Sequence, residues 1–552
     1  MRVPAESGGL TVHAVAGTYV VLLGFDLAED RCEGLLGFSI HRVDHTEDEA
    51  SYLTGMKCFE ATDPGFLPGS HFTTRDHPIQ SFQWADYSAK PGHEYTFTVA
   101  ALAGTPENLT VVASVTVDLV TESPASGGQD VYFNRGVAAS QEYARRFGNR
   151  EPEDVPNHAA FDWLSRGLYE AMTEFVRSTI PGVHALRIAA YEFHHAPFLE
   201  LLQERVDADV DVQIVYDHRK EQPGTKNAAA ADAAGLAPVC TQRTEGSSYI
   251  SHNKFIVKLE NDSPTSVWTG GTNFSPGGIF GHSNVAHVVE APAIAAKYLA
   301  YWELLAADPT TAALRDDVEA LTPTPTPDSS PAVGTTVYFS PRNNLALLEW
   351  YASLGRRATD GLFMTFAFGM NDLFKDVYRT SSAPLRFALL EKKTRAMKPG
   401  PERDAEEQAI QVLRNMPENI FAIGSFVRTN AIDGWVKEKL TSLNSNVRYV
   451  HNKFMLIDPL SADPIVIAGS ANFSAASTQE NDENMVVTRG NTRVADVYLG
   501  EFVRLYSHHA FRESLQWRKP DEQPKYLRTD HWWRPYFSDP TQTARRRYFA
   551  RT

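Results

Sequence analysis

Two histidine–lysine pairs in this 552-residue chain have the residue types and spacing needed to handle a phosphate ester. They are His252 with Lys254 and His451 with Lys453, each within the tetrapeptide His-Asn-Lys-Phe. Alternate residues of a strand point to the same face, so each imidazole should lie beside its ammonium. An ammonium neutralises phosphate oxygens, and an imidazole can attack phosphorus or carry a proton. We therefore expect both pairs to act on phosphate.

Each pair is followed by an apolar strand and then by a Gly-x-x-Asn-Phe-Ser turn. The residues of interest in the two turns are Gly270, Asn273 and Ser275, and Gly469, Asn472 and Ser474. The asparagine amides can donate hydrogen bonds to phosphate oxygens, and the serines can do the same or cap the following turn. A segment that recurs at this length indicates an internal repeat. Two copies brought together would place two histidines, two lysines and two asparagines around one phosphate.

A second sign of duplication lies upstream of each motif. A Pro- and Ser-rich spacer precedes Val131-Tyr-Phe-Asn-Arg135, and another precedes Val337-Tyr-Phe-Ser-Pro-Arg342. After each of these strands, helical and strand patterns alternate, which predicts parallel strands joined by right-handed crossovers. We therefore predict two α/β/α halves, at residues 129–322 and 335–552.

Residues 1–122 have a different pattern, rich in short alternating strands separated by turns. The order of these strands is similar to a fibronectin type III or immunoglobulin-like sandwich, with Trp84 in the core and Tyr95 in a late strand. By analogy alone, such a domain could dock another protein. Its scattered histidines are expected to be structural, as are His282 and Glu192 in the first half.

The motifs resemble the signature of the phospholipase D superfamily. In the second copy the matching residues are His451, Lys453, then after four residues Asp458, and further on Gly469, Ser470 and Asn472. In the first copy they are His252, Lys254, Gly270, Gly271 and Asn273. The first copy has Leu259 where the family usually has aspartate. The resemblance extends to Glu483, which in many members is a carboxylate that orients the histidine; the equivalent residue of the first copy is Asn284.

What the resemblance implies can be stated as expectations. The two halves should form an intramolecular pseudo-dimer with one shared cleft. One histidine should become a covalent phosphohistidine, while the other protonates the leaving alkoxide and then activates water or an alcohol. No metal or organic cofactor is expected. Glu483 should bond the second ring nitrogen of His451, and Asp458 should support the site from behind the residues that touch the phosphate.

Composition limits the class of substrate and the cellular compartment that we expect. The formal net charge of −16 weighs against a protein wrapped in nucleic acid, so a phospholipid is favoured. Three cysteines, Cys32, Cys58 and Cys240, provide no disulfide framework. The N-terminal sequence lacks a basic segment followed by an apolar run, and no stretch approaches the ~20 apolar residues of a spanning helix. We expect a cytoplasmic monomer without membrane insertion.

Three functions remain open from the sequence. The first is a phosphodiester hydrolase of phospholipase D type, including transfer of the phosphatidyl group to an alcohol. The second is a metal-independent nuclease of the same superfamily, and the third is an inactive scaffold. A lipid enzyme needs an apolar rim, for which Trp532, Trp533 and Phe537 are candidates, whereas a nuclease needs a basic channel.

Overall fold

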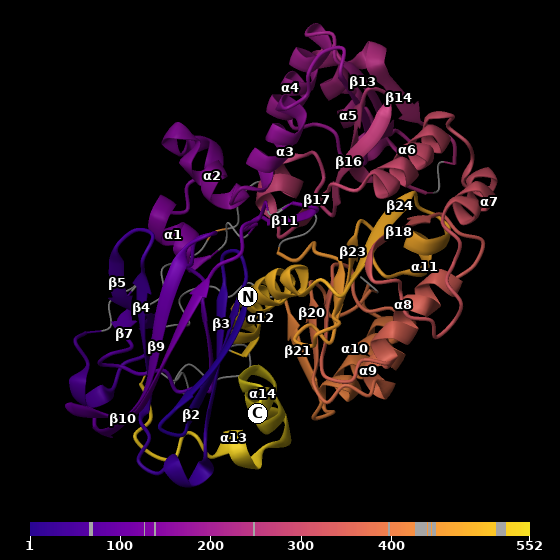
Figure 1. Cartoon of the computed structure of the whole chain (residues 1–552). Helices are drawn as coiled ribbons and strands as arrows, with labels where there is room; N and C mark the ends of the chain where they lie inside the picture. The colour runs from indigo at the N-terminus through magenta and orange to yellow at the C-terminus, as the bar shows by residue number, and fades with distance from the viewer. Residues whose placement is uncertain are drawn as a thin grey trace.

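Three lobes make up the computed structural model of the chain (Figure 1). It describes residues 1–65, 70–125, 127–136, 140–246, 249–395, 398–424, 439, 443, 449–514 and 526–552. The first lobe is all β, and the other two are α/β, as predicted. Among the described residues, no helix has the length and apolar character needed to cross a bilayer.

The N-terminal lobe is a sandwich of two four-stranded antiparallel sheets, ordered β1-β2-β3-β8 and β10-β9-β4-β5. Its strands are β1 (Arg2–Ser7), β2 (Leu10–Ala16), β3 (Val21–Leu27), β4 (Gly37–Asp44), β5 (Glu49–Tyr52), β8 (Gln83–Asp86), β9 (Glu94–Thr105) and β10 (Asn108–Val120), with the short pair β6 (Thr54–Gly55) and β7 (Phe72–Thr73) beside them. Phe25, Phe38 and Phe97 lie fully buried between the sheets, whereas Trp84 packs only partly buried at their margin. The core is therefore built on phenylalanines and not on the tryptophan that the sequence suggested.

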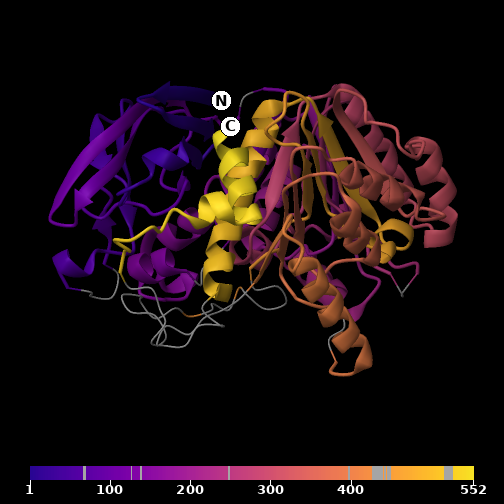
Figure 2. The same cartoon turned by 90° about the horizontal axis from the view of Figure 1, so that it is seen from below.

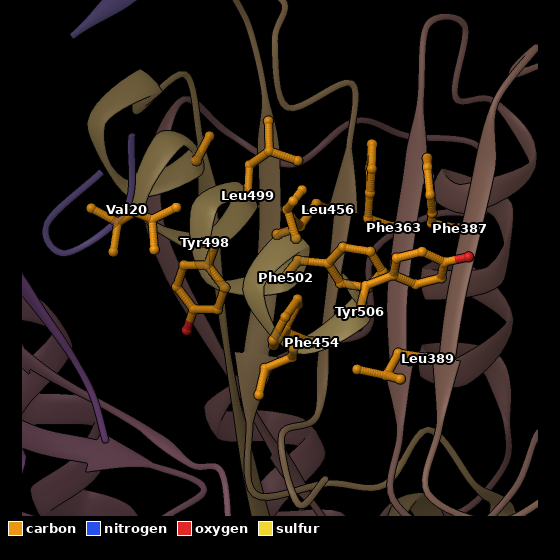
Figure 3. Packing of buried hydrophobic residues seen from close by; sticks show 14 of the residues in the cluster. Val20, Phe363, Phe387, Leu389, Phe454, Leu456, Tyr498, Leu499, Phe502 and Tyr506 are labelled. Carbon is orange, nitrogen blue, oxygen red and sulfur yellow. The ribbon is translucent and has the colours of Figure 1, made fainter. Parts of the chain in front are cut away.

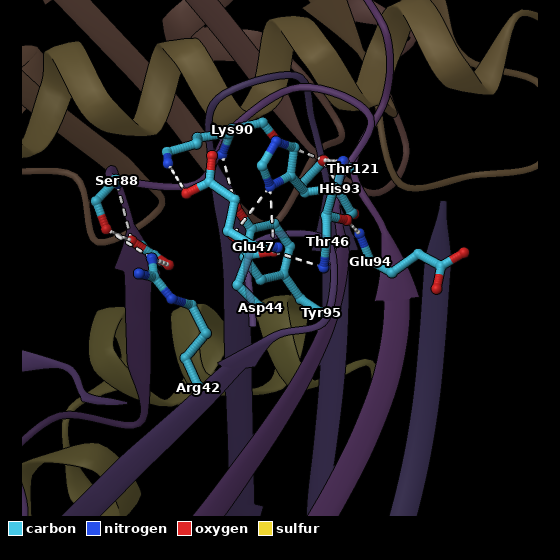
Figure 4. Close-up of polar contacts among 11 residues, drawn as sticks. Arg42, Asp44, Thr46, Glu47, Ser88, Lys90, His93, Glu94, Tyr95 and Thr121 are labelled. Carbon is cyan, nitrogen blue, oxygen red and sulfur yellow. Dashed lines mark hydrogen bonds and ion pairs between the residues drawn. The ribbon is translucent and has the colours of Figure 1, made fainter. Parts of the chain in front are cut away.

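The polar residues at one end of the sandwich hold its turns (Figure 4). Asp44 accepts hydrogen bonds from the backbone N–H groups of Thr46 and Glu47, and its carboxylate lies 2.9 Å from Nδ1 of His93. Tyr95, in β9, accepts a hydrogen bond from the backbone of Lys90 at 2.9 Å. His93 thus has the structural role expected of the histidines in this domain.

The two α/β lobes have the same strand order, which runs first, seventh, sixth, fifth, second, third and fourth in each seven-stranded sheet. The first half contains β11 (Gln129–Phe133), β12 (His184–Ala190), β13 (Asp211–Asp217), β14 (Cys240–Arg243), β15 (Lys254–Glu260), β16 (Ser263–Gly270) and β17 (Val285–Val289). The second contains β18 (Gly334–Ser340), β19 (Leu362–Phe366), β20 (Arg386–Leu390), β21 (Asn419–Ile423), β22 (Phe454–Ile457), β23 (Ile465–Gly469) and β24 (Glu483–Arg489). This shared topology confirms the predicted pseudo-dimer.

Helices cover both faces of each sheet (Figure 1). Those of the first half are α1 (Gln141–Phe147), α2 (Ala159–Ser165), α3 (Leu168–Arg177), α4 (Ala196–Asp207), α5 (Glu221–Ala233), α6 (Pro292–Ala306) and α7 (Thr311–Leu321). Those that follow are α8 (Ala346–Arg356), α9 (Asp372–Thr380), α10 (Pro401–Arg414), α11 (Ala475–Gln479), α12 (Thr492–Ser514), α13 (Pro535–Ser538) and α14 (Pro540–Ala550). The parallel strands β12, β13 and β14 are joined through α4 and α5, and β19, β20 and β21 through α9 and α10, as the alternating pattern predicts.

The strands that carry the two motifs are fixed by apolar residues on their opposite faces. In β22, Phe454 and Leu456 pack against α12, where Phe502 and Tyr498 meet them (Figure 3). In β15, Phe255 and Val257 join the equivalent cluster around α6. Alternation along a strand then places each lysine on the face away from these clusters.

The C-terminal segment leaves the second half and returns to the sandwich. Helix α14 contacts β2, β3 and β8, and a Cβ on Gly24 of β3 would lie 2.2 Å from the carbonyl carbon of Phe549. Trp532 and Trp533 are buried in the sandwich core. The predicted second half, 335–552, therefore includes a C-terminal segment that packs on the sandwich, although Tyr548 and Phe549 of α14 also pack against Phe363 and Phe387 of the second half. The two tryptophans do not form a lipid-facing rim. In both views the yellow C-terminal helices lie beside the indigo sheet (Figures 1 and 2).

Candidate active site

The two histidine loops are held by backbone hydrogen bonds that cross between the halves. The N–H of His252 donates to the carbonyl of Asp482 at 2.9 Å, and the N–H of His451 donates to the carbonyl of Ser283 at 3.2 Å. Short β-bridges accompany both contacts. Because Asp482 and Ser283 occupy equivalent positions in the two repeats, the arrangement has pseudo-twofold symmetry. It brings both histidines into one buried site, where burial chiefly lowers the pKa of His451 and the charges of Lys254 and His252 from the other half add to that effect.

Glu483 supports the histidine of the opposite half. Its Oε2 lies 2.9 Å from Nδ1 of His252, and both side chains are buried. The expectation that Glu483 bonds His451 is therefore wrong. Glu483 is the first residue of β24, directly after the loop that contacts the first half. Its carboxylate therefore lies across the pseudo-twofold axis, beside His252 of the first half. Burial alone would raise the pKa of Glu483, but the neighbouring His252 and Lys254 outweigh burial and lower it.

Asn284 takes the equivalent place beside His451. Its Oδ1 lies 2.9 Å from Nδ1 of His451, and its side chain is fully buried. The two histidines therefore differ in their partners: His252 has a carboxylate and His451 has a neutral amide. Burial lowers the pKa of His252 to about 4, with Glu483 opposing that shift. For His451, burial and then Lys453 hold the pKa well below its usual range.

Both lysines are buried beside their histidines. The ammonium of Lys254 donates to the carbonyl of His252, and that of Lys453 donates to the carbonyl of His451 at 2.8 Å. Burial lowers the pKa of Lys254 to about 7. Burial, together with the charge of Lys254, holds the pKa of Lys453 well below its usual range. An anion that binds beside the two lysines would favour their charged forms, which burial disfavours in the empty site.

The asparagine turns return to the same edge of each sheet. Thr269 pairs with Phe255 and Ala468 pairs with Phe454, so the turns that follow come back beside the lysines. Both turns need glycine: a Cβ on Gly270 would lie 2.4 Å from the carbonyl oxygen of Val285, and one on Gly469 would lie 2.2 Å from that of Asn484. The Oδ1 atoms of Asn273 and Asn472 are buried and have no hydrogen-bond partner.

Both serines hold the turn that follows them, and Ser275 makes one further contact. Ser474 caps α11 by accepting the N–H of Ser477 at 3.2 Å. Ser275 accepts the N–H of Gly278 at 3.2 Å and donates its hydroxyl to Glu192 at 2.5 Å. Both serines thus shape the turns, and Glu192 makes the structural hydrogen bond expected of it.

Asp458 lies away from the site, in contrast to the expectation. It follows the far end of β22 and accepts backbone hydrogen bonds from Thr359, Asp360 and Gly361 at 2.7 to 3.1 Å. It therefore closes the turn that leads into β19. The first half has Leu259 within β15 at the equivalent position and shows that this aspartate is dispensable for the geometry around the histidines.

Two aromatic residues at the ends of the central strands line the site, and no sequence motif marks them. Tyr191 follows β12; its ring centroid is 4.8 Å from that of His252 and 5.0 Å from Nζ of Lys254. Phe368 follows β19; its ring is 42% exposed, 6.4 Å from that of His451, with Nζ of Lys392 5.5 Å away. Their position just after a central strand is the signal that could have identified them, because the C-terminal ends of parallel strands form the site.

A buried ion cluster lies behind His252. Asp482 accepts from Nη2 of Arg243 at 3.1 Å and lies 3.4 Å from Arg219, and all three side chains are fully buried. Asp217 accepts the N–H of Ser251 at 2.6 Å. This cluster fixes the loop that ends at His252. Over the described parts of the chain, no three histidine, cysteine or acidic side chains gather to hold a metal ion.

Comparisons with known proteins found one family model that matches part of the chain, and distant structural similarities. Residues 365–506 match the family model described as cardiolipin synthase, PLD-like domain. No curated protein sequence matches the chain. A distant structural similarity exists to phosphatidylserine synthase of Haemophilus influenzae Rd KW20, with a TM-score of 0.41 and 10% identity over 62% of this chain and 85% of that one.

Two further solved structures show comparable similarity. The tyrosyl-DNA phosphodiesterase of yeast has a TM-score of 0.33 and 12% identity, covering 57% of this chain and 85% of that one. The polyphosphate kinase of Porphyromonas gingivalis has a TM-score of 0.37 and 11% identity, covering 59% of this chain and 46% of that one, so the chain spans less than half of the kinase. Because these TM-scores are low, the similar structures provide no evidence about chemistry. The chemistry of this chain is inferred from its own residues.

Proposed function

We propose that the chain is a phosphodiesterase that works through a covalent phosphohistidine, and the match of residues 365–506 to a PLD-like domain model supports this proposal. The observation that carries the proposal is the pair of buried histidines, one from each half, whose Nδ1 atoms are both engaged by a neighbouring side chain. Because Nδ1 of each ring is hydrogen-bonded, Nε2 is the nitrogen that can attack phosphorus or transfer a proton. Phosphoryl transfer needs chiefly positioning and charge neutralisation, which this site supplies.

His252 is the nucleophile in this proposal. When its Nε2 bonds to phosphorus while Nδ1 keeps its proton, the ring becomes positively charged. Glu483, 2.9 Å from Nδ1, compensates that charge, whereas the neutral Asn284 beside His451 cannot. As the N–P bond forms, the bond from phosphorus to the leaving oxygen breaks.

His451 is the proton carrier. In this proposal, Nε2 of His451 takes up a solvent proton when the anionic substrate binds, because a nearby negative charge favours the cationic ring. It gives that proton to the departing oxygen and then takes a proton from the water or alcohol that attacks phosphorus, as the N–P bond to His252 breaks. A neutral partner suits this role, because a histidine without a carboxylate releases its proton more readily. Lys254, Lys453, Asn273 and Asn472 would hold the non-bridging oxygens.

The substrate is a phosphodiester, and we propose a phospholipid ahead of a nucleic acid. In an in-line displacement by His252 the leaving alcohol departs on the side of His451, where the exposed ring of Phe368 stands. An apolar alcohol fits that ring, and the net charge of −16 disfavours a long polyanion. The nuclease reading is supported by Lys392 beside Phe368, since a ring for a base next to a cation for phosphate suits single strands.

Turnover of matched substrates tests the proposal. Phosphatidylcholine vesicles, single-stranded DNA, RNA and a chromogenic diester would be assayed with EDTA, using the wild-type chain with His252→Ala and His451→Ala. We expect each variant to lose turnover by at least about a thousandfold. Near-full activity of either variant would exclude the two-histidine mechanism, and no turnover by the wild type would favour the scaffold.

Trapping the intermediate identifies the nucleophile. After mixing with substrate and a rapid alkaline quench, mass spectrometry should find the phosphoryl group, still esterified to the alcohol that did not leave, on the peptide that carries His252. The same adduct on the His451 peptide would reverse the two assignments while keeping the mechanism.

A further inference from the structure

His282 packs against His451 and has no part in the steps above. Their ring centroids are 4.5 Å apart, and His282 is 8% exposed. It follows the turn Gly277–Gly281 and precedes β17, and its carbonyl accepts a hydrogen bond from Nδ2 of Asn134 at 3.0 Å. Its backbone and ring are therefore both held in place beside the proton carrier.

The amide of Asn284 lies between the two histidines, and its orientation is fixed by its neighbours. Its Nδ2 donates to the carbonyl of Gly278 at 2.7 Å and lies 3.0 Å from Nδ1 of His282. A carbonyl oxygen only accepts, so the amide end beside Gly278 must be the NH2 group. Oδ1 is then the atom that faces Nδ1 of His451.

The hydrogen positions on both rings follow from that orientation. An NH2 group only donates, so Nδ1 of His282 must be an unprotonated acceptor and the ring must carry its proton on Nε2. An amide oxygen only accepts, so Nδ1 of His451 must carry a proton. Each hydrogen of the Asn284 amide then has an acceptor, one on Gly278 and one on His282.

We propose that His282 is a positioning residue that, through Asn284, holds His451 in the tautomer with its proton on Nδ1. This keeps Nε2 of His451 as the nitrogen that exchanges protons with the leaving group and with water; that consequence rests on the proposed function, whereas the tautomers do not. Without the acceptor on His282, one hydrogen of the Asn284 amide would be buried and unpaired, and the bond to Gly278 would hold the amide against His451 without that second support.

The surroundings keep His282 neutral. The charged groups around it are Glu192, which favours its protonated form, and Lys453, which opposes that form, and the neighbouring ring is that of His451. Burial dominates and lowers the pKa of His282 to about 4. The second half shows a matching arrangement with other groups: Asn481, at the position equivalent to His282, donates to Oε1 of Glu483 at 3.3 Å. Each residue that orients a catalytic histidine thus has a further partner of its own.

The test reads tautomers directly. In the full chain labelled with 15N-histidine, long-range 1H–15N spectra should show His451 protonated on Nδ1 and His282 protonated on Nε2. In His282→Phe, which keeps a ring but removes the acceptor, His451 should become a mixture of tautomers. We expect kcat for the chromogenic diester to fall about tenfold, with KM within about twofold, because only proton transfer is disturbed.

Two more variants complete the test. His282→Gln, whose side-chain oxygen can accept from Asn284, should restore the single tautomer and most of kcat. In an Asn284→Ala background, His282→Phe should cause no further loss, since the two residues act in series. The proposal is overturned by a proton on Nδ1 of His282 in the wild type, by an unchanged tautomer of His451 in His282→Phe, or by losses that multiply in the double variant.

The tautomers are measured by NMR without substrate. They therefore test the role of His282 whether or not the chain is active. A wild-type chain without turnover would remove the phosphodiesterase proposal alone. If His282→Phe does not fold, the wild-type spectrum and His282→Gln still decide.

Discussion

His252 and His451 are the same residue in the same motif, yet their second ring nitrogens meet different groups. A carboxylate beside His252 stabilises a positively charged ring, and an amide beside His451 orients the ring without charge compensation. Burial depresses the pKa of both rings, and it is the carboxylate that opposes this effect at His252. A duplicated site has in this way become a site with two distinct chemical roles.

Replacing Glu483 with glutamine tests this division. The amide keeps the shape of the side chain but loses its charge, so the cationic phosphohistidine on His252 should be destabilised. We expect kcat to fall about a hundredfold or more, with less trapped intermediate after the quench. Glu480→Gln, at a partly exposed residue that pairs with Arg315, is the control and should keep near-normal kcat. A loss smaller than about threefold in Glu483→Gln would contradict the assigned role.

Binding of inorganic phosphate should be coupled to proton uptake. In the empty site, burial lowers the pKa of Lys254 to about 7, so at pH 8 its amine is largely neutral. An anion favours the charged amine and raises that pKa, so the complex takes up a proton when it forms at pH 8. At pH 6 the amine is already charged and this contribution disappears. Calorimetry in buffers of different ionisation enthalpy measures the uptake, and a buffer-independent heat at pH 8 would contradict it.

The residues of the site were accessible from the sequence, but their pairing was not. Glu483 and Asn284 stand at equivalent positions in the repeats, so their importance could be predicted. Which histidine Glu483 or Asn284 supports depends on the rotation that relates the two halves. A sequence motif contains no information about that rotation. Asp458 failed as a site residue for a related reason, since spacing along β22 places it at the opposite end of the strand from His451.

At the scale of elements, the loop before His252 depends on a strand start in the other half. Asp482 accepts the backbone N–H of His252 through its carbonyl, and its carboxylate pairs with Arg243 and Arg219. The ion cluster joins the ends of β13 and β14 to the start of β24. Removing this carboxylate would take away the ion pair of Arg219 and one of the two ion pairs of Arg243, which would keep Asp308 at 2.6 Å.

Asp482→Asn should therefore lower stability strongly. We expect a loss of about 3–5 kcal/mol, the range for breaking a buried ion pair, together with reduced turnover as His252 loses its fixed position. Asp211→Asn is the matched control: its carboxylate pairs with Arg187 at 2.6 Å but is 55% exposed, so the change should cost no more than about 1 kcal/mol. Thermal unfolding of both variants measures the difference, and equal losses would contradict the importance of the cluster.

At the scale of the whole molecule, the chain closes on itself. The first strands and the last helices form one unit: α14 covers β2, β3 and β8, and Trp532 and Trp533 complete the sandwich core. The sequence predicted the sandwich, because alternating strands have a local signal. It could not predict the return of the C-terminus, because the sequence pattern of the aromatic cluster around Trp532 and Trp533 is the same whether the cluster packs on a lipid or on a distant sheet.

Trp532→Ala tests that closure. The indole is 4% exposed, its Nε1 donates to the carbonyl of Leu35 at 2.7 Å, and its ring lies 5.7 Å from that of Phe82. Removing it leaves a cavity and an unpaired carbonyl, which should destabilise the sandwich by about 3–5 kcal/mol. Val333→Ala, at a side chain that is 76% exposed, should change stability by less than about 0.5 kcal/mol.

Hydrogen exchange localises the effect of Trp532→Ala. Amides of β2 and β3 should lose protection, while those of β15 and β22, which carry the histidine motifs, should keep it, because Trp532 packs in the sandwich core and not in the clusters that hold those two strands. Turnover should accordingly stay near the wild-type value at temperatures where the sandwich remains folded. Loss of protection in β15 and β22 as well would show that the two α/β halves need the sandwich to stay together, and would make the N-terminal lobe part of the catalytic unit.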